Sequence, residues 1–287
     1  MTKDQRGIQA FHPILHARSS RYYWKGQGSL SIKTFRNGRA LYQAGRGTFA
    51  VDEGNYLLLN EGQEYSIAIE EDAPVESFCV FFPRNMLGEV CRSLASGHER
   101  LLDDPQSDGR GTIEFVERTY GDDPWVAPLM AHMRALYPVR GSEHGWLEEM
   151  LHALALALLR VRRQVRLEMA AMTPLKASTR EELYRRVHIG HDFLSAYYKE
   201  PVTLTEAARA ACMSPNHFLR SYKQLFGMSP HQFVTEKRLQ EARLLLLATE
   251  KSVTDIALEV GYHSPGSFSS LFSRRFSAAP SRFRQKR

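Results

Sequence analysis

Polar side chains suited to contacting an anionic partner recur in two similar segments near the C-terminus. They are Asn216, Arg220 and Lys223 in the first segment, and Ser267, Ser270 and Arg274 in the second. Arginine and lysine neutralise phosphate groups, and arginine and asparagine can also make paired hydrogen bonds to the edge of a base. The chemistry open to these residues is recognition by charge and hydrogen bonding.

An internal repeat positions these side chains. The first copy runs from Thr203 to Phe233 and the second from Ser252 to Phe283. Each copy has aromatic residues at i, i+4 and i+8, which predicts a helix that buries one aromatic face and leaves its polar face outside. These residues are Phe218, Tyr222 and Phe226 in the first copy, and Phe268, Phe272 and Phe276 in the second.

Each copy also carries the start signals of two successive helices. A hydroxyl residue followed by an acidic residue three positions later predicts a capped first helix, and Ser-Pro predicts the start of the second. The signals are Thr203 with Glu206 and Ser214-Pro215 in the first copy, and Ser252 with Asp255 and Ser264-Pro265 in the second. This order is typical of a helix-turn-helix unit.

The segment Gln232–Leu247 between the copies is predicted to form one helix of ~24 Å. A helix of this length can hold two recognition helices near the ~34 Å that separates successive major-groove faces of DNA. We therefore expect one chain to contact two adjacent major-groove segments, with DNA bending where the spacing falls short.

The basic charge of the chain is concentrated in the same region. Residues 179–287 contain 17 Lys and Arg against 10 Asp and Glu, a net charge of +7, whereas the remaining residues contain 21 against 22, a net charge of −1. A domain that meets a polyanion has this excess, although a solvated basic surface would have it too.

The cysteines and the apolar segments indicate a cytoplasmic protein that does not span a membrane. Cys79, Cys91 and Cys212 lie far apart without a CxxC pair, which indicates neither a disulfide framework nor a thiolate zinc site. The polar stretch Met1–Ala10 lacks the apolar core of a signal peptide, and no apolar run is long enough to cross a bilayer.

The C-terminal segment Ile256–Arg284 resembles the signature of the AraC/XylS transcription regulators, and Leu204–Phe233 resembles the first helix-turn-helix of that family. The resemblance covers roughly Thr179–Arg284. It implies that the second helix of each unit lies in the major groove of double-stranded DNA. It also implies a regulator that works with RNA polymerase, usually as an activator.

The resemblance assigns DNA-contacting positions to both units. Base-reading positions are Asn216, Leu219 and Arg220 in the first unit, and Pro265, Gly266 and Ser270 in the second; backbone contacts are Ser214, Lys223, Ser264, Arg274 and Arg275. Because the second unit offers only small side chains, we expect the first unit to supply most base discrimination. Arg220 is the best candidate for a paired guanine contact, worth ~1–3 kcal/mol.

Two residues depart from the family pattern at turns. Cys212 stands where the family has glycine in the first turn, and Ser277 replaces the glycine after Phe276. We expect slightly different turn geometry at both positions, with the fold retained.

The first hundred residues are predicted to form short strands. Runs rich in β-forming residues are Ser29–Phe35, Thr48–Val51, Tyr56–Leu59, Tyr65–Ile69 and Glu76–Phe82. Their spacing suggests a barrel or jelly roll, and the family resemblance implies a cupin-like β barrel that binds an effector. The expected fold is thus α+β with two domains: a β domain over 1–122, a helical dimerization segment over 123–172, a linker over 173–178 and the DNA-binding domain over 179–287.

A heptad pattern marks the helical segment. Its apolar positions are Leu147, Leu151, Leu154, Leu158, Val161 and Val165. This seam can pair with its twin in a homodimer, or it can pack on the barrel of its own chain. The family resemblance favours the dimer.

A run of cations and aromatic rings precedes the predicted strands. Its candidate effector-binding residues are Arg18, Arg21, Tyr22 and Trp24. They could form a lid over an anionic or aromatic effector. Alternatively, the run is a solvated arm, or a strand that packs its aromatic rings on the barrel.

An enzyme with a cupin-type barrel fused to a DNA-binding domain is the alternative function. No histidine occurs from Ala17 through Gly97, so the usual ligands of a cupin metal site are missing, and we expect neither a metal nor a cofactor. The tetrapeptide His188-Ile189-Gly190-His191 matches an adenylate-forming motif, but it lies within a predicted helix, where a chance match is the better explanation. No nucleophile-elbow, P-loop or dinucleotide motif occurs.

Overall fold

The computed structural model describes residues 12–95, 113–121, 123–172 and 176–284. The chain divides into two compact units, an N-terminal unit (Met1–Gly45 with Phe49–Ala171) and a C-terminal unit (Met172–Arg287 with Arg46–Thr48). Residues 1–10, domain-boundary residue 122 and linker residues 173–175 lie outside the described residues. Within the described residues, no helix is long and apolar enough to cross a bilayer.

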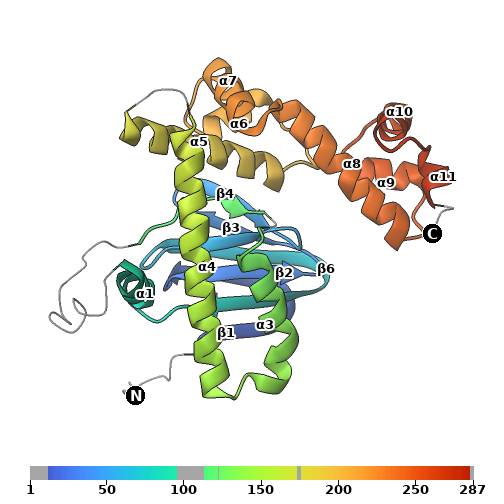
Figure 1. The fold of residues 1–287 in the computed structure, drawn as a ribbon. Coiled ribbons are helices and arrows are strands. Elements are labelled where there is room, and N and C mark those ends of the chain that lie inside the picture. The colour runs from blue at the N-terminus through green and yellow to red at the C-terminus, as the bar shows by residue number, and fades with distance from the viewer. Residues whose placement is uncertain (1–11, 96–112, 122, 173–175, 285–287) are drawn as a thin grey trace, which may run out of the picture. The chain divides into compact units, whose positions relative to one another are not determined.

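The N-terminal unit is built on an antiparallel sheet that forms a nearly closed barrel (Figure 1). The described strands are β1 Ile14–Gln27, β2 Ser31–Arg36, β3 Ala40–Ala44, β4 Gly47–Val51, β5 Tyr56–Leu59, β6 Glu64–Phe81 and β7 Thr119–Tyr120. They are ordered β4-β3-β6-β2-β5-β7, with β1 paired to β6. The expected β barrel is confirmed.

The 18-residue strand β6 organises this sheet. Its two halves were predicted as separate strands, Tyr65–Ile69 and Glu76–Phe82, but they form one strand. β3 pairs with the first half and β2 with the second half, whereas β1 follows almost the whole length. The register of β1 against β6 shifts between Ser19 and Arg21, so the strand pair bends without ending.

The cation-aromatic run lies within β1 and is the first strand of the barrel, not a segment that precedes it. Arg18, Arg21 and Tyr22 are exposed on this strand, and Trp24 packs on the barrel, with its ring centroid 4.8 Å from that of Tyr65. The strand is held to β6 by a long antiparallel ladder. The run is therefore a paired strand of the barrel on which Trp24 packs, while Tyr22 and Tyr23 stay exposed; its role in effector binding stays a prediction.

The barrel interior is filled mostly by aromatic and aliphatic side chains. Phe35, Tyr42 and Phe49 are almost fully buried in it. Lys33 is also buried, with its Nζ 3.8 Å from the centroid of the Phe81 ring. Burial lowers the pKa of Lys33 to about 8. Among the described residues, no group of three or more His, Cys, Asp and Glu side chains could hold a metal ion.

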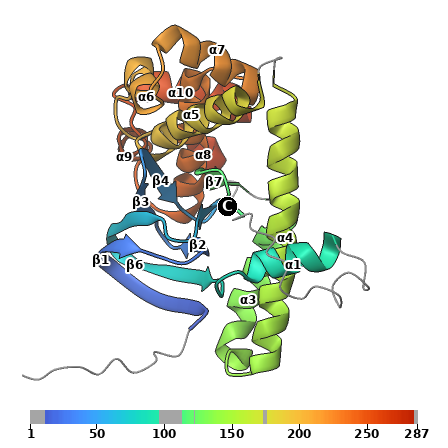
Figure 2. The same cartoon turned by 90° about the vertical axis from the view of Figure 1, so that its left-hand side faces the viewer.

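Three described helices belong to this unit: α1 Met86–Ala95, α3 Val126–Arg140 and α4 His144–Ala170. α3 and α4 form a helical hairpin, and α4 also packs on α1 (Figure 2). α3 lies against the sheet, because Arg134 Nη2 donates a hydrogen bond of 2.6 Å to Thr34 Oγ1 in β2, and the Tyr137 ring centroid is 5.9 Å from that of Phe78 in β6.

The heptad seam of α4 is covered by its own chain. Leu151, Leu154, Leu158, Val161 and Val165 are buried, and Leu147 is half-buried. Burial within one chain agrees with the second of the two alternatives, and the contacts of α4 with α3 and α1 contribute to it. Side chains that already fill the core of one copy cannot be the surface that meets another copy.

Residues 176–284 of the C-terminal unit form helices and the connections between them. Its described helices are α5 Ala177–Ala196, α6 Leu204–Ala210, α7 Pro215–Phe226, α8 Pro230–Ala248, α9 Val253–Glu259, α10 Pro265–Phe276 and α11 Pro280–Arg284. Two separate apolar cores form. The beginning of α8 joins the core of α5, α6 and α7, while the rest of α8 joins the core of α9, α10 and α11. The linking helix predicted over Gln232–Leu247 is confirmed and is slightly longer, with 19 residues and a length of ~28 Å.

Candidate nucleic-acid interface

The first helix of each repeat begins at the predicted cap. Thr203 forms a full capping box: its Oγ1 accepts from the backbone N–H of Glu206 at 3.2 Å, and the Glu206 carboxylate accepts from the backbone N–H of Thr203 at 2.8 Å. Ser252 forms the looser version, in which its Oγ accepts from the backbone N–H of Asp255 at 3.0 Å and donates to the carboxylate at 2.6 Å. These bonds satisfy backbone donors that no helical carbonyl can reach.

The second helices, α7 and α10, are built alike. Ser214 and Ser264 accept from the backbone N–H groups of His217 at 3.4 Å and Ser267 at 3.3 Å, and a proline follows each serine. The aromatic residues at i, i+4 and i+8 have the same ring-centroid separations in both helices, 5.5 Å and then 4.6 Å. The first two rings of each series are fully buried. Both copies are therefore genuine helix-turn-helix units with equivalent packing.

The tetrapeptide at 188–191 lies inside α5 and contributes to this packing. A Cβ atom on Gly190 would lie 2.4 Å from the Phe218 ring, so glycine lets α7 approach α5 closely. His191 Nδ1 is 2.9 Å from the Tyr222 hydroxyl, and its ring stacks on Phe226 with a centroid distance of 4.4 Å. The structure gives the motif a packing role in the first helix-turn-helix unit.

The turns of both helix-turn-helix units have a positive φ, including the positions where glycine is replaced. Cys212 has φ 51°, and its counterpart Gly261 has φ 94°. Ser277 caps α10 with φ 55°, as Gly227 caps α7 with φ 69°. The turns are thus retained, with φ values that differ between the two copies, and the two non-glycine residues carry a conformational cost that glycine avoids.

Replacing Ser277 or Cys212 with glycine is expected to stabilise the C-terminal unit by ~1 kcal/mol each, because glycine adopts a positive φ without this cost. Urea unfolding followed by far-UV circular dichroism measures the effect. Ser267→Gly is the matched control: Ser267 lies inside α10, where the same change should destabilise by ~0.5–1 kcal/mol. A loss of stability in Ser277→Gly would contradict the prediction.

The outer faces of α7 and α10 are exposed as predicted, although their edges differ. Asn216, Arg220 and Lys223 are exposed on α7, and Gly266, Ser270 and Arg274 on α10; Ser214 and Ser264 are exposed N-caps, whereas Leu219 and Pro265 are half-buried. His217 was not among the predicted contact residues, and Ser267 was predicted on the outer face without a base-reading role; both are exposed at the second position of this face. Their spacing of three from Arg220 and Ser270 could have identified them.

Arg274 and Arg275 have different surroundings. Arg275 makes an ion pair of 2.8 Å with Glu236 of α8, and this hydrogen bonding lowers the pKa of the Glu236 carboxyl. Arg274 is exposed and has no ion pair within the described part of the chain. Of the two arginines predicted to contact phosphates, Arg274 is therefore better placed, and Arg275 holds α10 to the linking helix.

Within the C-terminal unit, Arg238 connects the two helix-turn-helix units by hydrogen bonds to backbone carbonyls. Its Nε donates to the carbonyl of Tyr198 at 2.6 Å, its Nη2 to that of Glu200 at 2.7 Å and its Nη1 to that of Gly261 at 2.8 Å. Partial burial lowers the pKa of this guanidinium. Arg238 thus ties the segment after α5 to the turn of the second unit. No local sequence signal identifies this role, since the partners are distant carbonyls.

Two helix-turn-helix units on one linking helix, with basic and hydrogen-bonding outer faces, define a double helix-turn-helix DNA-binding domain. Residues 207–286 match a family described as a helix-turn-helix domain. An uncharacterized HTH-type transcriptional regulator of Haemophilus influenzae is 42% identical over 82 residues, 29% of this chain and 28% of that protein. The virulence regulon transcriptional activator VirF of Yersinia enterocolitica is 25% identical over 247 residues, 86% of each chain.

A transcriptional regulator with an AraC-type DNA-binding domain from Chromobacterium violaceum has a solved structure that is 30% identical, covers 35% of this chain and 90% of that chain, and has a TM-score of 0.34. The C-terminal unit therefore carries a helix-turn-helix DNA-binding domain similar to those of AraC-type transcription regulators.

Proposed function

We propose that this protein is a cytoplasmic, homodimeric activator of transcription that acts with RNA polymerase and responds to a small-molecule effector bound by the N-terminal unit. The pair of exposed recognition faces joined by α8 is the observation that carries the DNA-binding part of this proposal. Similarity to VirF, a transcriptional activator, over most of both chains supports activation.

In this proposal, the two recognition helices contribute differently to base discrimination and to affinity. α7 presents Asn216, His217 and Arg220, whose side chains can hydrogen-bond to base edges. α10 presents Gly266, Ser267 and Ser270, which reach less far, and Arg274 lies at its C-terminal end, where a phosphate contact suits a cation. The first unit therefore selects the sequence, and the second adds affinity.

Arg220→Ala is expected to cost ~1–3 kcal/mol of binding free energy on the preferred site and to relax the choice of base at one position. Arg274→Ala should weaken binding to all sequences alike and reduce the salt dependence by about one ion. Binding of promoter fragments with single base changes under each unit, measured by fluorescence anisotropy over a salt series, tests both. Equal losses for base changes under the two units would overturn this division.

The dimer contact in this proposal is the exposed face of α4, opposite the buried seam. Glu149, His152, Leu156, Arg160 and Arg163 lie along this face and are all exposed. An antiparallel pair of these helices, centred on Leu156, places Glu149 of each copy beside Arg163 of the other. The contact is self-complementary in charge, as a two-fold symmetric interface requires.

Glu149→Arg should weaken this dimer by more than about tenfold, because it places like charges at both ends of the interface. Adding Arg163→Glu in the same chain should restore it by exchanging the charges. Sedimentation velocity on the full chain measures the dissociation, and Glu148→Arg, on the neighbouring exposed flank, is the control. Failure of the double variant to recover the dimer would rule out this face.

A further inference from the structure

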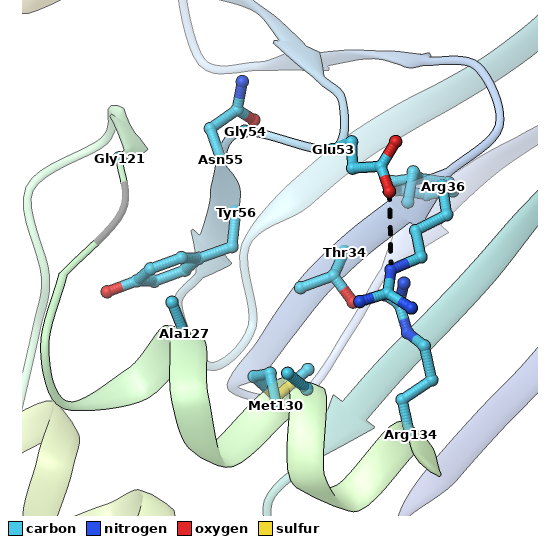
Figure 3. A pocket seen from close by; sticks show the side chains of 12 residues that line it. Thr34, Arg36, Glu53, Gly54, Asn55, Tyr56, Gly121, Ala127, Met130 and Arg134 are labelled. Carbon is cyan, nitrogen blue, oxygen red and sulfur yellow. Dashed lines mark hydrogen bonds and ion pairs between the residues drawn. The ribbon is translucent and has the colours of Figure 1, made fainter.

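A cavity of about 260 Å³ lies between the sheet and α3 in the N-terminal unit. Strand β2 supplies Thr34 and Arg36, β5 supplies Tyr56, and α3 supplies Met130 and Arg134 (Figure 3). It lies on the helix-covered side of the sheet and shares Phe35 with the aromatic interior of the barrel. None of the candidate effector residues of β1 lines it.

Arg134 brings a buried and incompletely bonded cation to this cavity. Its residue is only 8% exposed, and its Nη2 donates to Thr34 Oγ1 at 2.6 Å. The Thr34 hydroxyl donates in turn to the carbonyl of Phe78 at 2.6 Å, so Thr34 holds the guanidinium in place. Within the described residues, Arg134 Nε is buried without a hydrogen-bond partner. A guanidinium has five donors, and burying them without partners costs free energy.

Arg36 of β2 places a second cation in the same cavity, from the side of the sheet. Both guanidinium groups extend toward Thr34 (Figure 3), and repulsion from Arg36 adds to burial in lowering the pKa of Arg134. The ion pair of Arg36 is weak, because Glu53 lies 3.7 Å away and the two side chains are 45% and 69% exposed.

The other nearby carboxylate, Glu76, already has partners. His16 Nε2 is 2.9 Å from its Oε1, and Arg18 is 3.8 Å from its Oε2 on the β1 side. An anion between Arg36 and Arg134 would therefore meet two guanidinium groups whose carboxylates are exposed or shared. Planar carboxylates match the fork of arginine donors.

The remaining wall of the cavity is mostly apolar. The Tyr56 ring lies across from the arginines, and Ala127 and Met130 line the cavity along α3. We propose that this cavity binds a small carboxylate with a short apolar body, its carboxylate held by Arg36 and Arg134 and its body packed on Met130 and Tyr56. The volume, below that of sites for drug-sized ligands, limits the body to a few carbon atoms.

A ligand at this position contacts both the sheet and the first helix of the α3–α4 hairpin. It therefore stabilises one placement of α3 on β2. The identification of this ligand as the effector rests on the proposed function. The binding of a carboxylate in the cavity does not depend on it.

Calorimetric titration of the full chain with pentanoate tests the site, with pentan-1-ol, pentylamine and inorganic phosphate as matched probes. We expect pentanoate to bind more tightly than the alcohol or the amine, and more tightly than phosphate, which lacks the apolar body. Arg36→Gln should weaken pentanoate by about tenfold. Ala127→Leu should abolish binding while keeping both arginines, because its side chain fills the cavity. Arg140→Gln, at the other end of α3 and paired with Glu143, should change nothing.

Equal binding of pentanoate and pentan-1-ol, or undiminished binding in both Arg36→Gln and Ala127→Leu, would overturn the proposal. The affinity for promoter DNA, measured with and without saturating pentanoate, separates it from the proposed function. A carboxylate that binds here but leaves DNA affinity and dimerization unchanged overturns the effector role and leaves the site standing. Absence of promoter binding both without ligand and with saturating pentanoate overturns the proposed function alone.

Discussion

Gly261→Ala is expected to destabilise the C-terminal unit by ~2–5 kcal/mol, because two costs act at one position. The backbone of Gly261 has φ 94°, which residues with a side chain rarely adopt. In addition, a Cβ atom there would lie 2.3 Å from the backbone carbonyl oxygen of Lys199. That carbonyl cannot withdraw easily, since Arg238 bonds the carbonyls on either side of it.

A matched variant separates the two costs. Gly227 also has a positive φ, 69°, but a Cβ atom there meets nothing within 4 Å, so Gly227→Ala should cost only ~1 kcal/mol. Far-UV circular dichroism follows unfolding of the helical unit. The tryptophans, Trp24, Trp125 and Trp146, all lie in the N-terminal unit and report on it separately. Similar losses for the two variants would show that the contact with Lys199 does not matter.

Lys33→Met should stabilise the N-terminal unit by about 3 kcal/mol near neutral pH. The lysine is 2% exposed inside an aromatic core, and burial lowers its pKa from 10.5 to about 8. Below pH 8, folding must bury the charged ammonium group, and methionine of similar length removes that cost. Lys25→Met, at an exposed position of β1, should change stability by less than ~0.5 kcal/mol.

The pH dependence identifies the cause. Between pH 8 and 10.5 the unfolded chain holds a proton on Lys33 that the folded chain has lost, so the Lys33 contribution makes the wild type more stable as the pH rises. The advantage of Lys33→Met should therefore be largest below pH 8 and disappear near pH 10.5. Urea unfolding followed by tryptophan fluorescence measures this difference, in which the tyrosines common to both proteins cancel. A constant difference over this range would exclude the buried charge as its source.

Local signals account for the success of sequence analysis in the C-terminal unit. The caps at Thr203 and Ser214, and the aromatic residues of α7, act over one or two helical turns, so a single sequence contains them completely. The repeat supplied each signal twice. What local signals could not supply was the backbone geometry at Cys212, where the neighbouring structure imposes a conformation that the residue itself disfavours.

The barrel was harder to predict because its strands depend on distant partners. The sequence of β1 lacks a regular alternation of apolar and polar residues, and most of the strand is exposed. Its long pairing with β6, which the sequence does not reveal, holds it in the sheet. The Glu-Glu-Asp-Ala-Pro stretch within β6 has the composition of a loop, yet the strand continues through it. The cavity beside Arg134 combines residues from β2, β5 and α3, which no spacing in the sequence connects.

Periodicity also left the role of α4 undecided for a physical reason. A heptad of apolar residues shows that one face of a helix is covered, but a second subunit and the helix's own domain cover it equally well. The buried seam from Leu151 to Val165 shows which of them does so within this chain. The exposed, charged face of α4 on the opposite side is then the surface that is left for the proposed dimer contact.

Because the linking helix α8 is shared by the two apolar cores, its length sets the rotational phase of one DNA-binding unit against the other. One inserted residue would turn the second unit by about 100° and advance it by about 1.5 Å, directing its recognition face away from the groove. The length of this helix therefore fixes the separation of the two half-sites within one recognition site, and a promoter with a different separation would lose contact with one of the two units.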